Sequence, residues 1–353
     1  MRYKTFGRQT GLRVSEVALG GGNFGNRLGY GSQAQDARVM FDAYVTAGGN
    51  FIDTSENYQF GESEELVGQF IAGRRQEFVI GTKFTQSADK EATLSKTGNS
   101  RKNMIYSLEQ SLKRLKTDHV DLYWVHMPDF MTPMEEIVRA FDDLARAGKI
   151  LHAGLSNFPA WRAARGATIS DLRGAAPIVA IQIEYSLVER TAERELLPMA
   201  EALGLGVATW SPLGGGLLTG KYRSSPEGRA KSLGVLVHRE TEQRHTAIID
   251  ALFDVAKEIE RTPTHVAIGW LRARSARSTT GIVPILGPRT IDQLNDTLDA
   301  LTVTLSIEQL EKLEQASAFA LGVPHEMIGN DYYRTKLSGG KPELFDYPKF
   351  TVA

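Results

Sequence analysis

Short apolar segments recur along the chain, separated by longer stretches that mostly have the pattern of amphipathic helices. Most of these segments are continuous apolar runs rather than alternations, which is typical of parallel strands buried on both faces. The predicted strands are residues 16–20, 50–53, 78–82, 120–125, 150–155, 178–184, 206–210 and 282–286. This alternation of strands and helices restricts the fold to an α/β architecture.

The stretches between the strands carry apolar residues at steps of three and four, as expected for helices that pack on a sheet. In residues 101–116, for example, Ile105, Leu108 and Leu112 share one face, and Ser100 is placed to cap the first turn. The other predicted helices are residues 33–47, 62–72, 133–147, 158–170, 190–203, 242–260, 264–275 and 290–300.

Strands and helices in this order admit either an open doubly wound sheet or a closed barrel, and the strand count favours a (β/α)8 TIM barrel. A barrel of this kind takes roughly 250 residues, so we predict a single barrel domain over residues 1–353. Residues 1–14 are predicted to form an N-terminal β-hairpin. Residues 211–241, rich in Gly and Ser, and residues 320–353 lack a clear period, and we expect the C-terminal segment to lie as a loop over the active site.

Composition and charge exclude several classes of function. A formal net charge of −1 offers no extended basic surface for nucleic acid. Cysteine and paired-histidine motifs are absent, so neither a disulfide nor a metal site is predicted. No signal peptide or membrane-spanning run is visible. We expect a cytoplasmic protein that acts on a small molecule, and the sequence carries no signal for its oligomeric state.

Two glycine-rich patterns resemble nucleotide-binding motifs without their structural context. GGGNFG at 20–25 fits G-x-G-x-x-G, but loop residues follow it where a dinucleotide-binding turn needs a helix. Residues 215–221 fit G-x-x-x-x-G-K, but Tyr222 stands where a phosphate loop needs Ser or Thr for Mg²⁺. We therefore predict neither a Rossmann domain nor an ATPase.

Barrel enzymes carry their chemistry at the carboxyl ends of the strands, and four chemically related residues stand there. Asp53 ends the second predicted strand, and Tyr58 lies in the loop beyond it. Lys83 follows the third strand and His126 follows the fourth. Each residue has an ordinary structural interpretation when taken singly, such as a turn cap for Asp53 or a core histidine for His126. Their joint placement at successive strand ends favours a catalytic site.

The chemistry of these four side chains is coherent. A phenol has an unperturbed pKa of about 10, too high for easy proton transfer at neutral pH. An ammonium group beside it stabilises the phenolate, a carboxylate holds the lysine in place, and an imidazole can hydrogen-bond to a substrate oxygen. The set therefore predicts a proton donor for a developing alkoxide, which carbonyl reduction requires.

Longer stretches of the chain resemble the aldo-keto reductase family. DTSENY at 53–58, followed by Gly61 and Glu62, is similar to the family signature D-T-A-x-x-Y-x-x-G-x-S-E. The similarity continues through TK at 82–83, SLKRLKTDHVDLYWVHMPD at 111–129, GLSNF at 154–158, QIEYS at 182–186, WSPLGGGLLTGKY at 210–222 and ILGPRTIDQL at 285–294. The resemblance implies a TIM barrel that uses NADP(H) to reduce an aldehyde or ketone to an alcohol.

The resemblance also implies roles for individual residues. Tyr58 corresponds to the general acid, Lys83 to the partner that lowers its pKa, Asp53 to the ion-pair partner of the lysine, and His126 to the residue that orients the carbonyl. The implied cofactor-binding residues are Gly21, Gly22, Ser156, Asn157, Gln182, Trp210, Ser211, Pro212, Leu213, Gly216, Lys221, Arg229, Gly287, Arg289, Gln293 and Asp296.

Within that set, Trp210 corresponds to the aromatic side chain that stacks on the nicotinamide, and Arg289 lies in the segment near the adenosine 2′-phosphate. The candidates for the substrate pocket are Phe24, Tyr30, Phe84 and Met127, with Phe130, Tyr332 and Tyr333 as further possibilities. Their aromatic character indicates an apolar or cyclic carbonyl compound. Packing of these side chains on the barrel is an equally weighted alternative.

The motif at 210–222 is similar to bacterial reductases and to the potassium-channel β-subunit branch of the family. An alternative function is therefore a nucleotide-sensing binding module resembling those subunits. His126, which that branch can lack, favours an enzyme. Thr297 is a departure, because members of the branch often carry Asn at this position.

Overall fold

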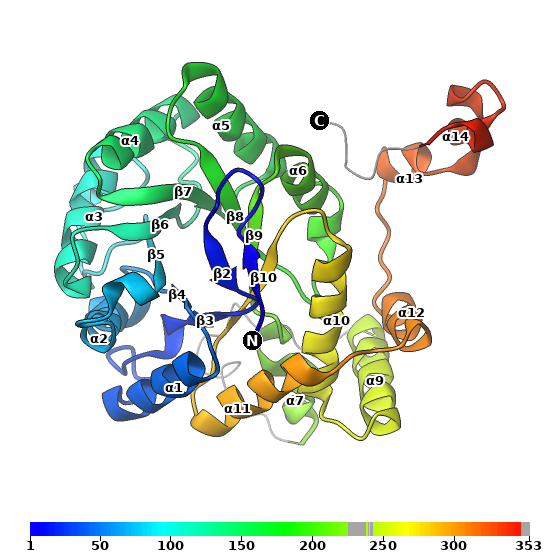
Figure 1. The fold of residues 1–353 in the computed structure, drawn as a ribbon, viewed down its shortest axis with the longest axis horizontal. Helices are drawn as coiled ribbons and strands as arrows, with labels where there is room; N and C mark the ends of the chain where they lie inside the picture. The colour runs from blue at the N-terminus through cyan, green and yellow to red at the C-terminus, as the bar shows by residue number, and fades with distance from the viewer. Residues whose placement is uncertain (225–237, 239, 241–242, 347–353) are drawn as a thin grey trace.

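The computed structural model describes residues 1–224, 238, 240 and 243–346, and its centre is a closed barrel of parallel strands (Figure 1). The barrel strands are β3 (Ala18–Gly20), β4 (Phe51–Asp53), β5 (Val79–Phe84), β6 (Val120–Val125), β7 (Ile150–Ser156), β8 (Ile178–Glu184), β9 (Gly206–Trp210) and β10 (Ile282–Leu286). Each strand pairs with its neighbours in the sequence, and β10 closes the barrel against β3. The predicted (β/α)8 barrel is confirmed, and every predicted strand overlaps one of these eight.

Helices at the predicted positions surround the barrel (Figure 1). They are α1 (Ala34–Thr46), α2 (Glu62–Phe70), α3 (Arg101–Leu115), α4 (Met134–Arg146), α5 (Ala160–Arg173), α6 (Leu196–Leu203), α9 (Gln243–Glu258), α10 (Pro263–Arg277) and α11 (Ile291–Asp299). The helix predicted at 190–203 is shorter than expected. It begins at Leu196 because Pro198 is tolerated only in the first turn of a helix.

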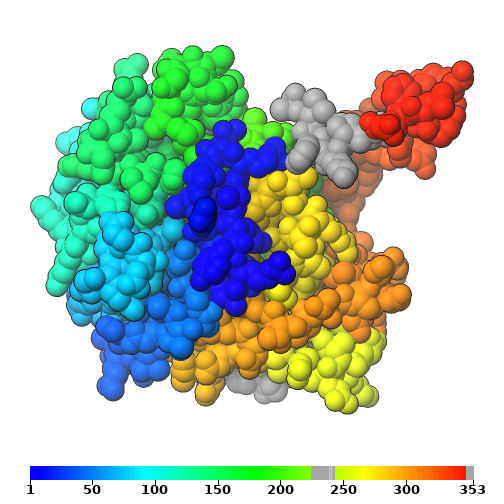
Figure 2. All heavy atoms as spheres, in the orientation of Figure 1, coloured from blue at the N-terminus to red at the C-terminus, as the bar shows by residue number. Residues whose placement is uncertain are grey.

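The predicted N-terminal hairpin is present and closes one end of the barrel. Its strands, β1 (Tyr3–Thr5) and β2 (Arg13–Ser15), pair in antiparallel fashion, with Tyr3 opposite Ser15. The hairpin lies across the face of the barrel that is nearest the viewer in Figures 1 and 2. Phe6, in the connection between the two strands, is fully buried and lies edge-on to Phe51 and Trp124. The opposite end, where the strands finish, is left for the functional site.

The barrel interior is filled by side chains and is not a pore. Trp124 on β6 is the largest of these and is fully buried. Gly154 on the neighbouring strand β7 pairs with Trp124 in register, and a Cβ at Gly154 would overlap the indole ring. Gly154 is therefore required by packing, because any side chain at this position would overlap the indole ring of Trp124.

The C-terminal segment departs from the prediction that it covers the active site. After α12 (Ile307–Ala316), which packs on α9, the chain forms two short helices, α13 (His325–Ile328) and α14 (Asp331–Leu337). These helices project sideways from the barrel (Figures 1 and 2). Tyr332 and Tyr333 are exposed, and no residue of 318–346 lines the pocket described below. The chain leaves from the outer helical layer, so its described part does not reach the mouth of the barrel.

Among the described residues, four α-helices were not predicted: α7 (Lys221–Ser224), α12, α13 and α14. For α12 the sequence does contain a signal, because Ser306 and Gln309 form a capping box at its first turn. Within its described residues, the chain has no helix with the length and apolar character needed to cross a membrane.

We predict that Gly154→Ala lowers the free energy of unfolding by about 1–3 kcal/mol, because the added methyl group overpacks the barrel interior against Trp124. Gly11→Ala is the matched control. It lies in the hairpin with no atom within 4 Å of the added Cβ, and should change the free energy by less than about 0.5 kcal/mol. Urea unfolding of both variants provides the measurement, and equal stabilities would contradict the packing role of Gly154.

Candidate active site

Lys83 and Asp53 form a buried ion pair at the bottom of the site. Lys83 Nζ lies 2.5 Å from Asp53 Oδ2, and the two side chains are 0% and 3% exposed. The ammonium also donates to the backbone carbonyl of Thr54 at 2.8 Å and to the Tyr58 hydroxyl at 3.3 Å. An ammonium group has three donors, so all of them are used. This contact set positions Tyr58 with respect to a fixed positive charge.

The charge on Lys83 is maintained despite its burial. Burial alone would lower the pKa of the ammonium, but the charge of Asp53 and the hydrogen bonds to Asp53 and Tyr58 outweigh it and hold the pKa above its usual value. The second carboxylate oxygen of Asp53 accepts a hydrogen bond from Gln182 Nε2 at 2.9 Å. The ion pair is therefore braced from β4, β5 and β8 together.

Tyr58 is presented by a tight turn, a 3₁₀ segment that spans Tyr58–Gly61. Gln59 and Phe60 both have φ of 53°, in the left-handed region that non-glycine residues adopt at a cost. The Gln59 side chain is fully buried and holds the facing loop, since Nε2 donates to the Tyr30 carbonyl at 2.8 Å and Oε1 accepts from the Leu28 amide at 2.9 Å. The turn that carries Tyr58 thus also fixes one wall of the pocket.

His126 faces Tyr58 across the site. The two rings meet edge to face, with their centroids 5.9 Å apart. Ser55 Oγ lies 3.3 Å from Nδ1 of the imidazole and holds the ring on the side away from Nε2. Burial, and then the charge of Lys83, lower the pKa of His126 to about 3. The imidazole is therefore neutral near neutral pH.

A pocket of about 600 Å³ opens above these four residues. Its lining includes Asp53, Tyr58 and His126, and Lys83 lies beneath it. The predicted cofactor and substrate residues that line it are Gly22, Tyr30, Met127, Asn157, Gln182, Trp210, Ser211, Pro212, Leu213, Gly216, Lys221, Gly287, Arg289, Gln293 and Asp296. Gly21 and Ser156 are buried directly behind this lining, and Arg229 lies outside the described residues.

Besides Tyr332 and Tyr333, three of the candidate substrate residues do not line the pocket, which corrects the sequence interpretation. Phe84 is fully buried and stacks on Tyr123, with the ring centroids 5.2 Å apart. Phe84 follows Lys83 in strand β5, and adjacent side chains in a strand point to opposite faces. Phe24 is also fully buried and packs edge-on against Phe70 of α2. Phe130 is 81% exposed and stands outside the lining.

Other lining residues were missed by the sequence analysis. Asn57 and Gln86 line the pocket and hydrogen-bond to each other. The loop that carries Gln86 is held by Glu56, whose carboxylate accepts from the amides of Thr85 and Ser87, both at 3.0 Å. Burial raises the pKa of Glu56 to about 7. The positions of Asn57 and Gln86, just after strands β4 and β5, were the signal that could have found them.

The lining fits a nicotinamide dinucleotide in three respects. Near the four residues, the Trp210 indole donates to Asn157 Oδ1 at 3.0 Å, which places a flat ring beside an amide. Asn23 Oδ1 is buried and has no hydrogen-bond partner among the described residues, so the wall offers an unused acceptor. At the far end, Lys221 and Arg289 supply positive charge for phosphate groups. A bound group with both an amide end and anionic groups matches this order of side chains.

The geometry at Arg289 suits an anion. Arg289 directly precedes Thr290, the N-cap of α11, whose hydroxyl accepts from the Gln293 amide. The Gln293 side chain in turn accepts from the Arg289 backbone amide at 2.9 Å. Arg289 thus directly precedes the first turn of a helix, where the backbone amides and the helix dipole favour negative charge.

Comparison with known proteins identifies a family for most of the chain. Residues 16–318 match the model of the aldo/keto reductase family. The chain is 37% identical to an uncharacterized oxidoreductase, YrpG, of Bacillus subtilis, over 89% of this chain and 95% of the relative. It is 32% identical to the putative aryl-alcohol dehydrogenase AAD14 of Saccharomyces cerevisiae, over 95% and 92%. An NADP(+) aryl-alcohol dehydrogenase of Phanerodontia chrysosporium is also 32% identical, over 93% and 89%.

We predict that the contribution of His126 to the free energy of unfolding depends on pH. The folded chain keeps His126 neutral down to a pKa of about 3, whereas the unfolded chain protonates it at about 6.5. As the pH falls between these values, only the unfolded state gains the proton, so the folded state loses up to about 1.4 kcal/mol per pH unit. In His126→Gln this contribution is absent.

Urea unfolding at pH 7, 6 and 5 provides the measurement. The free energy of unfolding should fall more steeply with acid for the unaltered protein than for His126→Gln. The other histidines are common to both proteins and cancel in the comparison. Parallel pH profiles would show that His126 is not held neutral by the fold.

Proposed function

The chain belongs to the aldo/keto reductase family, and from that premise we propose that it is an NADP(H)-dependent reductase of aryl aldehydes and ketones. The observation that carries this proposal is the buried ammonium of Lys83, which reaches both Asp53 and the Tyr58 hydroxyl. A phenol held against a permanent positive charge at the floor of a pocket is suited to give up a proton. Membership in the aldo/keto reductase family also supports an oxidoreductase activity.

In the proposed reaction Tyr58 is the general acid. When bound, a reduced nicotinamide supplies a hydride to the carbonyl carbon. Tyr58 gives its hydroxyl proton to the substrate oxygen as negative charge develops there, and Lys83 stabilises the phenolate that remains. The neutral His126 imidazole hydrogen-bonds to the same substrate oxygen and orients it. Asp53 does not exchange a proton in this scheme; it holds Lys83 in place.

The cofactor proposal rests on the cations at the far end of the pocket. NADPH differs from NADH by a 2′-phosphate, so discrimination requires a positive group where that phosphate lies. Arg289, beside the first turn of α11, is the residue we assign to it, and we assign Lys221 to the pyrophosphate. The name of the Phanerodontia relative as an NADP(+) enzyme supports the same cofactor.

The substrate proposal combines the pocket walls with the names of the relatives. Leu28, Tyr30, Met127 and Trp210 line the pocket and offer apolar and aromatic surface. Flat aromatic rings pack well against such side chains. Two of the relatives are described as aryl-alcohol dehydrogenases, whose products would be aryl carbonyl compounds. We therefore assign an aryl carbonyl group as the substrate class.

We expect NADPH-dependent reduction of benzaldehyde with a kcat/KM about 2- to 13-fold above that of heptanal, which has the same number of carbon atoms. The reason is the aromatic contact, worth about 0.5–1.5 kcal/mol beyond burial alone. Tyr58→Phe should lower kcat on benzaldehyde by about 10² to 10⁴ while NADPH still binds, because only the proton donor is removed. The assay follows NADPH absorbance, with fluorescence titration for binding.

Several results of that assay would contradict the proposal. Preference for heptanal would overturn the aryl substrate class. Near-normal kcat in Tyr58→Phe would overturn its role as general acid. Tight NADPH binding without turnover of any aldehyde, ketone or quinone would instead favour the nucleotide-sensing module.

We also predict that Arg289→Ala weakens NADPH binding by about 10- to 150-fold, the range for loss of a charged hydrogen bond of about 1.5–3 kcal/mol. The affinity for NADH should change little, because NADH lacks the phosphate, and Arg289→Lys should fall between the two for NADPH. Fluorescence titration measures the affinity of each of the three proteins for NADPH and for NADH. Equal losses for NADPH and NADH would show that Arg289 does not recognise the 2′-phosphate.

A further inference from the structure

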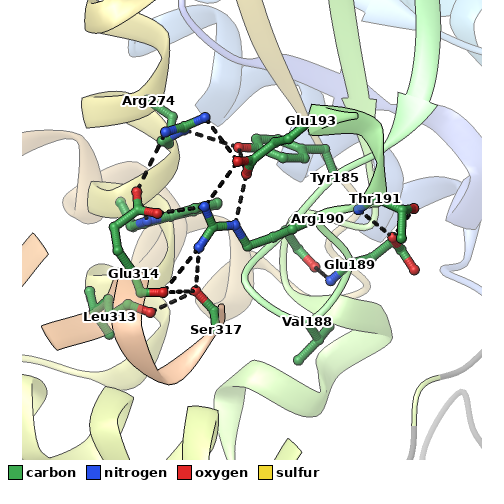
Figure 3. A network of polar contacts seen from close by, with 12 residues as sticks. Tyr185, Val188, Glu189, Arg190, Thr191, Glu193, Arg274, Leu313, Glu314 and Ser317 are labelled. Atoms are coloured by element: carbon green, nitrogen blue, oxygen red, sulfur yellow. Dashed lines mark hydrogen bonds and ion pairs between the residues drawn. The ribbon is translucent and has the colours of Figure 1, made fainter. Parts of the chain in front are cut away.

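The chain leaves the barrel at a point that is fixed by a buried network of charges (Figure 3). The Arg190 guanidinium, with a side chain only 7% exposed, pairs with Glu193 at 2.7 Å and with Glu314 of α12 at 2.5 Å. Arg274 of α10 pairs with the same two carboxylates, at 3.2 and 3.6 Å. Opposite charges alternate around the network, so the carboxyl end of α12 is held firmly against α10 and the loop after β8.

Three further contacts hold the first residues after α12. Arg190 Nη1 donates to Ser317 Oγ at 2.8 Å, and Arg244 Nη2 donates to the Ser317 carbonyl at 3.2 Å. Arg194 Nη2 donates to the carbonyl of Ala320 at 2.7 Å. These contacts attach the chain to the barrel up to residue 320, and His325 of α13 pairs with Glu195 at 3.6 Å, so the direction in which the chain leaves is set.

Residues 321–346, which we call the C-terminal arm, form a compact unit of their own. Their backbone hydrogen bonds run within the arm, as from the Arg334 amide to Asn330 and from the Gly340 amide to Thr335. The rings of Tyr332 and Tyr333 pack edge to face within α14. Figure 2 shows the arm standing out from the rounded body of the barrel. The arm is thus folded, but it lies beyond the layer of helices that encloses the core.

The arm exposes more apolar surface than its size accounts for. Its exposed side chains range from 37% for Leu321 to 85% for Val323 and Leu337. The large apolar ones are Leu321, Val323, Met327, Ile328, Tyr332, Tyr333, Leu337, Leu344 and Phe345. At about 100 Å² each they present roughly 900 Å², slightly more than the area of about 800 Å² that one partner contributes to a standard protein interface. Monomers rarely expose a larger apolar patch than about 300–600 Å².

The charges of the arm select the kind of partner. Among residues 321–346 the basic side chains are Arg334, Lys336 and Lys341, and the acidic ones are Glu326, Asp331, Glu343 and Asp346. This balance lacks the basic excess that an anionic membrane or a nucleic acid would require. The chain as a whole has a net charge of −1, so two copies repel each other only weakly.

We propose that the C-terminal arm is the interface through which this chain pairs with a second copy of itself, each arm lying on the barrel of the other. Reciprocal exchange of two arms about a two-fold axis uses the same surface twice, and together with the matching barrel surface it buries roughly 3,600 Å² in total, within the range of about 2,000–5,000 Å² for obligate dimers. The family match ends at residue 318. The arm follows the segment that the family model matches, and in this proposal it serves assembly.

The first test is sedimentation velocity of the full-length protein from about 1 to 50 µM. The unaltered chain should sediment as a dimer. The double variant Tyr333→Ser, Leu337→Ser removes two apolar side chains one turn apart on α14 and should raise the dimer dissociation constant at least about 100-fold. Leu172→Ser is the matched control, since Leu172 on α5 is 80% exposed and lies outside the arm. It should leave the oligomeric state unchanged.

A second test locates the arm in the assembly. The natural chain contains no cysteine, so Leu337→Cys gives one site for a benzophenone maleimide cross-linker. Protein labelled with ¹⁵N is mixed and re-equilibrated with unlabelled protein before irradiation. Cross-linked peptides that join a heavy and a light chain are the expected product.

The proposal fails if the unaltered protein is a monomer at 50 µM, or if the arm variant and the Leu172 control behave alike. It also fails if every cross-link joins peptides of the same isotope label, because the arm then folds back on its own barrel. Circular dichroism and NADPH titration of the arm variant serve as controls for the barrel, and both should match the unaltered protein.

Discussion

The buried ion pair of Lys83 and Asp53 is the interaction on which the rest of the site depends. Taking two charges out of water costs several kcal/mol for each ion, and the cost is offset only when every donor and acceptor finds a partner. Here Thr54, Tyr58 and Gln182 complete the set. Removing one partner of such a pair typically costs about 3–5 kcal/mol. The ion pair that positions the tyrosine is therefore also needed for the stability of the fold. The closed barrel meets this demand because β4, β5 and β8 all end around the same space.

Much of the fold could be predicted because buried parallel strands leave a plain mark in a sequence. Most strands of this barrel are apolar runs, and the polar residue at or just after the end of a strand is conspicuous by contrast, as with Asp53 and His126. What failed was the assignment of aromatic residues near the same strand ends. Strand β5 alternates its side chains, so an inward Lys83 requires an outward Phe84. That rule was available from the sequence, whereas the packing of Phe24 on Phe70 depends on how α2 is placed, which no local pattern reports.

The C-terminal arm was missed for a different reason. Local sequence patterns reveal the period of a helix, but α13 and α14 are too short to show one. The local sequence around aromatic residues such as Tyr332 and Tyr333 does not distinguish side chains that cover a pocket of their own chain from side chains that face outward. Their position is decided by the charge network at Arg190, which joins parts of the chain far apart in sequence and holds α12 to the side of the barrel. Long-range polar contacts of this kind cannot be read from neighbouring residues.

The N-terminal hairpin closes one end of the barrel and leaves the other end open, so the two ends of the molecule differ. Phe6 seals one end beneath β1 and β2, and the strand ends that carry the candidate site open at the other. The amino terminus leaves from the sealed end, where the Arg2 amide is hydrogen-bonded to Glu16 and the Lys4 ammonium to Ser275. A bead, electrode or carrier protein tethered through residue 1 would therefore sit behind the molecule, and an immobilised preparation would present its pocket to the bulk liquid.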